Sequence, residues 1–234
     1  MNKWIVKYEF FAIKAKLASS LALDLAPHRP SPKVTVLEGV ALQQARVHEC
    51  NGRSRVGFAM MVAAQMTGPV FWIAPKWQQE MLNPDGMCAF TKPQRFTFIT
   101  PIQPKDILWV MEETLRSGAV PLVVAQMPSL PSLTAVRRLH LAAEHSATAP
   151  LGLLLTASDS GAPGVESRWQ MQPNHGLTSQ CWNLSRTRAR TAPVKHWALT
   201  KTTAGLRLHP KVEQNFETVP KRHQNVESCY MTDK

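Results

Sequence analysis

Short, continuous apolar runs recur through the middle of the chain, and polar or turn-forming residues bound each of them. Runs of this kind are typical of strands that are buried on both faces of a parallel sheet. We therefore predict buried strands at 70–74, 120–125 and 151–156, and we expect two further strands at 46–50 and 96–100.

The segments between these runs have the periodicity of amphipathic helices. Pro104 suits the first turn of a helix that Gly118 ends, because the amide that proline lacks would have no partner there. Ser132 is a good N-cap for a helix to about His145. A further helix follows the first strand and ends near Met66. Strands that alternate with helices in this way predict an α/β fold with a mostly parallel sheet and helices on both faces.

The pattern changes after residue 165. Three strand-like segments, each with one tryptophan, are separated by turn-forming residues, at 167–172, 181–186 and 196–201. We predict that they form an antiparallel extension of the sheet. From about residue 209 the chain is polar and aperiodic, which predicts disorder.

The first 33 residues differ from the rest in composition. Residues 4–25 predict a helix, and the three prolines within 26–33 predict an extended linker. Charged residues interrupt every apolar stretch of this segment, so we expect neither an export signal nor a membrane span. We therefore expect an N-terminal helix and linker at 1–33, one domain at 34–208 and a basic tail at 209–234, in a protein of the cytoplasm.

The positive charge of the chain is uneven. The formal net charge is +11, and residues 183–234 carry ten Lys and Arg against four Asp and Glu. Such a basic segment attracts polyanions and releases their counterions. The alternative is a solvated tail that binds nothing. The hydrophobic fraction of 44% excludes a chain that is disordered throughout.

Few residues have the spacing of a catalytic or metal site. The four cysteines lie far apart, without a C-x-x-C pair, and indicate neither a zinc site nor a disulfide framework. No Ser, His and Asp arrangement emerges from spacing, and we interpret His48 and His175 as structural. The sequence therefore predicts no metal and no cofactor.

One loop has the glycine spacing of a nucleotide-binding P-loop. In G-x-x-x-x-G-K-[ST] the loop amides cradle phosphates, while the Lys and the hydroxyl serve the γ-phosphate and magnesium. Here Phe58 stands in place of the Lys and Ala59 in place of the hydroxyl. Unpaired amides at a helix start still attract anions. One interpretation is a vestigial anion loop, the other a pair of solvated arginines; the residues concerned are Gly52, Arg53, Ser54, Arg55 and Gly57.

A second part of a nucleotide-hydrolysing site is missing after the strand at 120–125. An NTPase carries an Asp there that holds magnesium, and this chain has Gln126. An amide loses most of the charge attraction for a hard cation. After the strand at 70–74 the next acidic residue is Glu80, several positions on. We therefore predict that the chain is not an enzyme.

Several of these segments together resemble a known family. ETLRSGAVPLVVAQM at 113–127 is similar to the part of RecA in which a helix leads into the strand of the magnesium-binding Asp. It is more similar still to the ImuA family of RecA- and SulA-like accessory proteins in bacterial translesion synthesis. The segments RVHECNGRSRVGFAM, GPVFWIAP, LTAVRRLHLAAEHS and WNLSRTRAR suggest the same family. The resemblance covers residues 38–201 and lends no support to either end of the chain.

The resemblance implies a RecA-like P-loop core without ATPase activity. It implies a role in the SOS response to DNA damage and in mutagenesis, beside ImuB and an error-prone C-family DNA polymerase, with RecA as a further candidate partner. Gln126 departs from the acidic residue that often stands there, which argues against metal binding and says nothing against partner binding. Two alternatives stay open: a weak P-loop NTPase and a SulA-like inhibitor of cell division.

Basic residues near the predicted C-terminal strands are candidates for contact with DNA or a partner. Arg186, Arg188 and Arg190 occupy every second position, so they would project from one face of a continuing strand. Lys195 and Lys201 on the next strand would extend this patch. We expect such a ridge to bind single-stranded DNA weakly and in a salt-dependent way. The alternative is an arginine-rich hairpin whose charges are solvated or meet an acidic partner.

Two further groups are candidates for the same role. Arg137 and Arg138 could form a ridge for a partner or DNA, or a solvated helix face. The tryptophans of the three C-terminal strands could stack on bases, or belong to the core. They are Trp169, Trp182 and Trp197.

Overall fold

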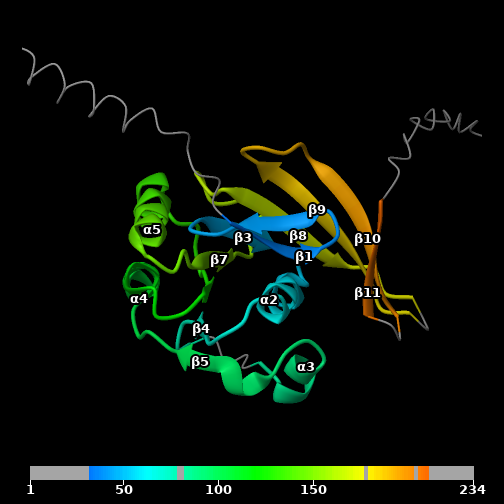
Figure 1. Cartoon of the computed structure of the whole chain (residues 1–234), viewed down its shortest axis with the longest axis horizontal. Coiled ribbons are helices and arrows are strands. Elements are labelled where there is room, and N and C mark those ends of the chain that lie inside the picture. Colours follow the sequence, from blue (N-terminus) through cyan, green and yellow to red (C-terminus); the bar gives the residue numbers. More distant parts are fainter. Residues whose placement is uncertain (1–31, 78–81, 177–178, 203–204, 211–234) are drawn as a thin grey trace, which may run out of the picture.

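The computed structural model describes residues 32–77, 82–176, 179–202 and 205–210. Most of the strands form one nine-stranded sheet in the order β11-β10-β9-β8-β3-β7-β6-β4-β5 (Figure 1). The six strands from β8 to β5 in this order are parallel, and β9 to β11 are antiparallel. The bounds are β3 Val47–Asn51, β4 Val70–Ile73, β5 Phe96–Ile99, β6 Leu122–Gln126, β7 Leu151–Leu155, β8 Ser167–Pro173, β9 Cys181–Ala189, β10 Lys195–Thr202 and β11 Gly205–Pro210.

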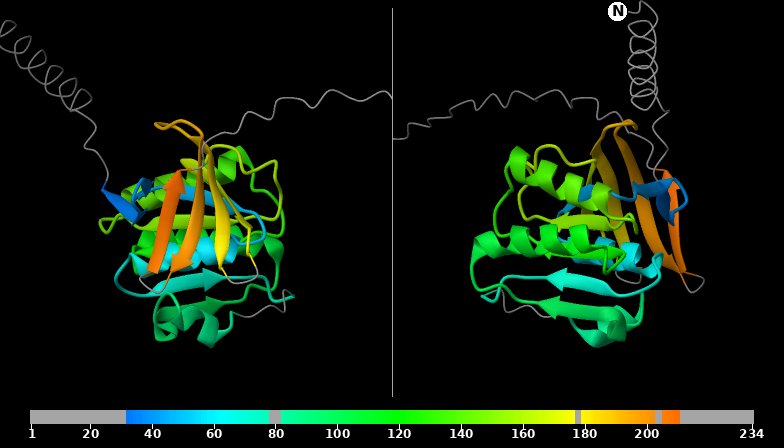
Figure 2. Two further views of the ribbon diagram at one scale, coloured as in Figure 1. Left: turned by 90° about the vertical axis from the view of Figure 1, so that its right-hand side faces the viewer. Right: turned by 60° about the vertical axis from the view of Figure 1, so that its left-hand side comes forward.

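Helices cover both faces of the parallel strands (Figures 1 and 2). One face packs against α2 (Arg55–Ala64), and we name it the α2 face. The other packs against α4 (Pro104–Ser117) and α5 (Leu133–His145), and we name it the α4/α5 face. The short helices α3 (Pro84–Cys88) and η1 (Pro93–Arg95) lie between β4 and β5 in the chain. The predicted α/β class, with a mostly parallel sheet and helices on both faces, is confirmed.

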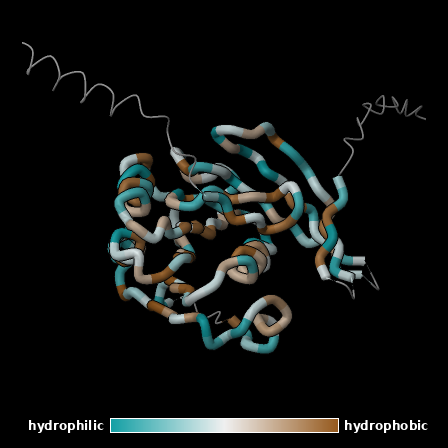
Figure 3. Tube along the Cα trace, viewed as in Figure 1, coloured by the Kyte–Doolittle hydropathy of each residue, from teal (hydrophilic) through white to brown (hydrophobic). Residues whose placement is uncertain are grey.

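The β6 strand explains why the parallel strands are apolar throughout. Leu122 and Val124 join the core on the α2 face, whereas Val123 and Ala125 join the core on the α4/α5 face. Successive side chains of a strand point to opposite faces, so a strand between two helical layers needs apolar residues at every position. Figure 3 shows such apolar positions along the strands in the middle of the sheet.

The helix ends follow their sequence signals. Gly118 ends α4 with a left-handed φ of 63°, and the Ser132 hydroxyl accepts a hydrogen bond from the amide of Ala135 at the start of α5. At the carboxyl end of α2, the guanidinium of Arg95 donates to the carbonyls of Ala63, Met66 and Gly68. The last carbonyls of a helix lack the amide partners that interior carbonyls have, so a cation from another element helps to hold the end of α2 in place.

The structure corrects several expectations. The strand at 167–172, predicted to be antiparallel, is β8 and runs parallel to β3; the antiparallel part begins at β9. The strand β11 continues to Pro210, past the predicted onset of disorder at 209. The remaining tail, from residue 211, and the predicted helix at 4–25 lie outside the described residues.

A hairpin that the sequence analysis did not predict precedes the sheet. Its strands are β1 (Lys33–Leu37) and β2 (Val40–Gln43), and they form a separate two-stranded sheet. The alternate residues Val34, Val36, Val40 and Leu42 are buried in the α2-face core, which also holds Trp197 of β10. The hairpin thereby helps to cover the apolar face of the antiparallel strands, which are seen face-on in the left view of Figure 2.

Candidate functional site

The loop with P-loop glycine spacing connects β3 to α2, at the carboxyl end of a central strand. Gly52 has a φ of 91°, and a Cβ there would lie 2.3 Å from the Met171 carbonyl oxygen of β8. Glycine is required because both the backbone conformation and the close strand exclude a side chain. Gly57 lies within α2, which begins at Arg55, and so is not part of the loop.

The amides of this loop already have acceptors within the chain. The Ser54 amide donates to the Met171 carbonyl at 3.0 Å, and the Arg53 amide donates to Gln172 Oε1 at 3.2 Å. The Arg55 amide donates to the Gly52 carbonyl at 3.3 Å. Three amides of the loop and the helix start are therefore hydrogen-bonded internally, two of them to β8.

The two positions that differ from a P-loop are part of the core. Phe58 and Ala59 are completely buried in α2. The Phe58 ring stacks on Trp169 with a centroid distance of 5.6 Å, and Trp169 stacks on Trp197 at 5.9 Å. An aromatic ring thus occupies the position at which a P-loop presents its lysine.

Gln126 is the last residue of β6 and is only 5% exposed. Its Oε1 has no hydrogen-bond partner among the described residues, and the same is true of Oδ1 of Asn51 at the end of β3. The Asn51 amide nitrogen donates to the Ser158 carbonyl at 3.1 Å. Both amides lie at the edge of the sheet where parallel α/β folds bind ligands.

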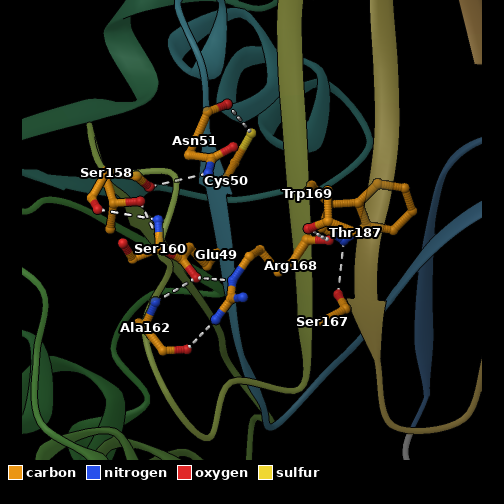
Figure 4. A network of polar contacts seen from close by, with 11 residues as sticks. Glu49, Cys50, Asn51, Ser158, Ser160, Ala162, Ser167, Arg168, Trp169 and Thr187 are labelled. Carbon is orange, nitrogen blue, oxygen red and sulfur yellow. Dashed lines mark hydrogen bonds and ion pairs between the residues drawn. The ribbon is translucent and has the colours of Figure 1, made fainter. Parts of the chain in front are cut away.

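A buried ion pair lies beside this edge (Figure 4). Glu49 of β3 is completely buried, and its carboxylate accepts from Arg168 Nε of β8 at 2.8 Å, from the Ala162 amide at 2.8 Å and from the Thr156 hydroxyl at 2.7 Å. Arg168 Nη2 also donates to the Ala162 carbonyl at 2.7 Å. We name Glu49, Thr156, Ala162 and Arg168 the polar network; it joins two strands to the loop between β7 and β8.

A bulge in β9 overturns the expected arginine ridge. Arg186 pairs with Trp169 of β8, whereas Arg188 pairs with Arg168, so Thr187 is an extra residue between them. Paired residues of neighbouring strands point to the same face, and an extra residue reverses the alternation. Arg186 therefore points to the α2 face and Arg188 to the α4/α5 face, and the expectation that they share one face is wrong.

Arg186 is part of the packing of the α2 face. Its guanidinium carbon lies 5.7 Å from the ring centroid of Trp169 and 5.6 Å from that of Trp197, and its Nε donates to the Pro193 carbonyl at 3.0 Å. Partial burial lowers the pKa of this guanidinium. On the same face, Lys195 lies over the Trp197 ring and Lys201 over the Phe90 ring.

The other candidate arginines lie on the α4/α5 face. Arg137 and Arg190, which the sequence analysis assigned to separate groups, line one hollow beside α5. Arg138 instead pairs with Glu112 of α4, with 2.7 Å between Nη2 and Oε2. The structure thus divides the seven basic candidates between two faces of the sheet.

Burial decides between the two interpretations for two of the tryptophans. Trp169 is 0% exposed and Trp197 is 3% exposed, so both belong to the core and neither offers a ring to a base. Trp182 is partly exposed and contacts His175 edge-on, with centroids 5.1 Å apart.

His48 is buried in a chain of hydrogen bonds, consistent with its structural interpretation. Its Nδ1 lies 2.7 Å from the Ser167 hydroxyl and its Nε2 lies 2.8 Å from the Gln43 carbonyl of the hairpin. The Ser167 hydroxyl also accepts from Trp169 Nε1 at 2.7 Å. Burial lowers the pKa of His48 to about 4, so the imidazole is neutral and links the hairpin to the sheet.

Sequence reasoning missed the polar network and the hollow beside α5. The one available signal for the network is an acidic residue inside the strand predicted at 46–50, because a charge within a buried strand needs a partner. Its partner, Arg168, is more than a hundred residues away in the chain, and no spacing rule connects the two.

Neither a membrane-spanning helix nor a cluster of metal ligands occurs among the described residues. In that part of the chain no helix is long and apolar enough to cross a membrane. Nor does it contain a group of three or more His, Cys, Asp and Glu side chains that could hold a metal ion.

Comparison with known proteins gives no family assignment. No protein-family model matches the chain, and no curated protein matches it.

Proposed function

We propose that this protein is a non-catalytic accessory protein of SOS-type translesion DNA synthesis and damage-induced mutagenesis. It has a RecA-like core and acts in the cytoplasm with an ImuB-like protein and an error-prone C-family polymerase. The basis for the partners is the resemblance of residues 38–201 to the ImuA family, above all in the segments at 113–127 and 133–146.

One observation carries the non-catalytic part of the proposal. At the helix that follows the central strand β3, the ring of Phe58 is buried against Trp169 where an NTPase presents its lysine. The loop amides before it are hydrogen-bonded to β8. A transferring phosphoryl group is stabilised by a lysine, a metal and free amides. In this chain the lysine is replaced, and the Arg53 and Ser54 amides are bonded to β8.

The arrangement of strands supports the RecA-like part. A central parallel strand leads through a glycine loop into a helix on one face, and further parallel strands lie on both sides of it. In open α/β sheets, ligands bind at the carboxyl ends of such strands. A core of this kind, with the Phe58 ring buried at the position of the lysine, fits a protein that has kept the fold and lost the nucleotide chemistry.

A weak contact with single-stranded DNA is a second part of the proposal. Arg188 lies in β9 beyond the bulge, Arg190 follows the end of that strand, and both are exposed. Phosphate contacts of this kind produce salt-dependent binding without sequence preference. Substituting both by alanine should weaken binding of labelled oligothymidine; equal binding by the variant would remove these two residues from that role.

Co-purification with the ImuB-like protein of the same organism tests the main proposal. We expect the two proteins to elute together from a gel-filtration column, and deletion of the gene to lower mutagenesis after DNA damage. A protein that leaves mutagenesis unchanged and blocks cell division when overproduced would instead support the SulA-like alternative. Steady ATP turnover would support the alternative of a weak NTPase.

A further inference from the structure

One line of α5 is exposed although it holds two large apolar side chains. Leu133, Arg137 and Leu141 are four residues apart, so they follow one another along one side of the helix. Leu133 is 58% exposed and Leu141 is 47% exposed. The opposite side of α5, with Val136, Leu139 and Ala143, forms the contact with the sheet. The exposed leucines are therefore not needed to attach α5 to the sheet.

Two hollows border this line. The first, of about 450 Å³, lies where α5 meets the end of β9, and Arg137, His140 and Arg190 are among its lining residues. The second, of about 320 Å³, lies between α4 and α5, with Arg116, Arg138 and Ala142 in its lining. Leu141 lines both. We name the three residues of the line together with the two hollows the α5 surface.

The charges of the α5 surface are only partly compensated within the protein. Arg46 is paired with Glu144 and Glu166, so the two carboxylates nearest the first hollow are already held. Arg137 has no hydrogen-bond or ion-pair partner among the residues that the structure describes, and the nearest ion-pair contact of Arg190 is 3.6 Å from Glu166. Two guanidinium groups therefore remain available to an external carboxylate.

His140 does not add to this charge at neutral pH. It is buried under the first hollow and its Nε2 lies 3.2 Å from the Gly164 carbonyl. Burial, together with Arg46 and Arg190, lowers its pKa to about 4. The positive charge of the first hollow thus comes from arginines, which are enriched at protein interfaces, whereas lysines are depleted there.

We propose that the α5 surface docks an acidic amphipathic helix of the ImuB-like partner, an inference that rests on the proposed function. Apolar side chains of that helix cover Leu133 and Leu141, and its carboxylates meet Arg137 and Arg190. The two leucines are eight residues apart, about 12 Å along a helix, which suits a partner helix of two to three turns. Neither hollow is lined by Phe, Tyr or Trp, the side chains on which the bases of single-stranded nucleic acid typically stack.

Binding of the purified ImuB-like protein to two variants, Leu141→Asp and Arg137→Glu, tests the inference. We expect each variant to bind at least about tenfold more weakly, because truncated or reversed anchor residues typically cost that much or more. Both should keep the melting temperature of the parent, since both side chains are exposed. Matched controls are Val194→Asp, which also replaces an exposed apolar residue, and Arg207→Glu, which also reverses an exposed arginine; neither should change the affinity.

The outcomes separate the inference from the function on which it rests. If the parent binds the ImuB-like protein and the two α5 variants bind it equally well, the α5 surface is not the docking site and the proposed function stands. If the parent does not bind, the proposed function fails and the inference fails with it. If labelled oligothymidine binds the parent and loses affinity in the same two variants but not in Arg188→Ala, the α5 surface takes nucleic acid and the inference is overturned.

Discussion

Two arginine-rich regions of the molecule differ in how far their charges are paired within the protein. At the carboxyl edge of the parallel strands, Arg168 is paired with the buried Glu49, and β8 accepts the amides of the glycine loop. On the α5 surface, Arg137 has no partner in the described part of the chain and two leucines are exposed. The charges of the first region are thus paired within the chain, although the Asn51 and Gln126 side-chain oxygens beside them have no partner among the described residues. In the second region a guanidinium and two leucines are left without partners in that part of the chain. This difference is the reason for proposing the α5 surface as the place where a partner docks.

Breaking the polar network should have the largest effect on stability. Glu49→Gln leaves Arg168 buried without a counter-charge, which typically costs about 3–5 kcal/mol. Urea unfolding of the parent and the variant measures this loss of unfolding free energy. A loss below about 1 kcal/mol, the value typical of an exposed ion pair, would contradict the burial of the pair.

A double variant sharpens this prediction. When Arg168 is replaced by Met in the Glu49→Gln variant, no unpaired charge remains buried, so part of the lost stability should return. If the double variant is less stable than Glu49→Gln alone, the cost comes from lost packing and not from an uncompensated charge.

Acid should destabilise the protein through its two buried histidines. Folding lowers the pKa of His48 and of His140 from 6.5 to about 4. Between these values the unfolded chain binds protons that the folded chain does not, so stability is fully present above pH 6.5 and is lost as the pH falls towards 4. The lowering of the pKa of His48 corresponds to a loss of about 3 kcal/mol of unfolding free energy at acid pH.

Unfolding free energies measured across this pH range check the prediction. His140→Gln should flatten the pH dependence, because one of the two groups no longer titrates. His145→Gln, in an exposed residue of the same helix, is the control and should keep the slope of the parent. An equal slope in all three proteins would show that His140 does not contribute to the acid destabilisation.

Replacing the two arginines on either side of the bulge should have smaller effects on stability, and the two effects should differ. Arg186→Ala removes a guanidinium that lies over two tryptophan rings and donates to Pro193, which should cost about 1–2 kcal/mol. Arg188→Ala removes an exposed side chain and should change stability by less than about 0.5 kcal/mol. Equal effects of the two variants on the melting temperature would contradict the reversal of faces at Thr187.

The smallest effect is expected on the α5 surface. Leu141→Ser should change the unfolding free energy by less than about 0.5 kcal/mol, because the side chain is largely exposed. Leu139→Ala, two residues away and 1% exposed, should cost about 2–5 kcal/mol. A large loss from Leu141→Ser would show that this leucine serves the fold and is not available to a partner.

Local patterns predicted most of the elements and little of their long-range pairing. The buried strands were recognised because two-sided burial requires continuous apolar runs, and α4 and α5 because Pro104, Gly118 and Ser132 mark their ends. The hairpin was missed because its apolar residues alternate next to prolines that favour a linker. The direction of β8 was missed because its tryptophan and short length do not distinguish a parallel strand from an antiparallel one.

The candidate residues were predicted less well, for a related physical reason. Alternation placed Arg186, Arg188 and Arg190 on one face, and a single extra residue at Thr187 reversed it. No local signal marks that bulge. The hollow beside α5 combines Arg137 with Arg190, which are brought together only by packing of a helix against the end of a distant strand.

Nucleotide binding is the most direct test of the claim that the glycine loop at the carboxyl edge of the sheet is packed and hydrogen-bonded within the chain and takes no nucleotide. Titration of the purified protein with a fluorescent ATP analogue and magnesium should give no saturable signal and no phosphate release. The reason is that Phe58 is buried in place of a lysine and the loop amides are bonded to β8. Saturable binding that unlabelled ATP displaces, with turnover in proportion to protein concentration, would contradict the account.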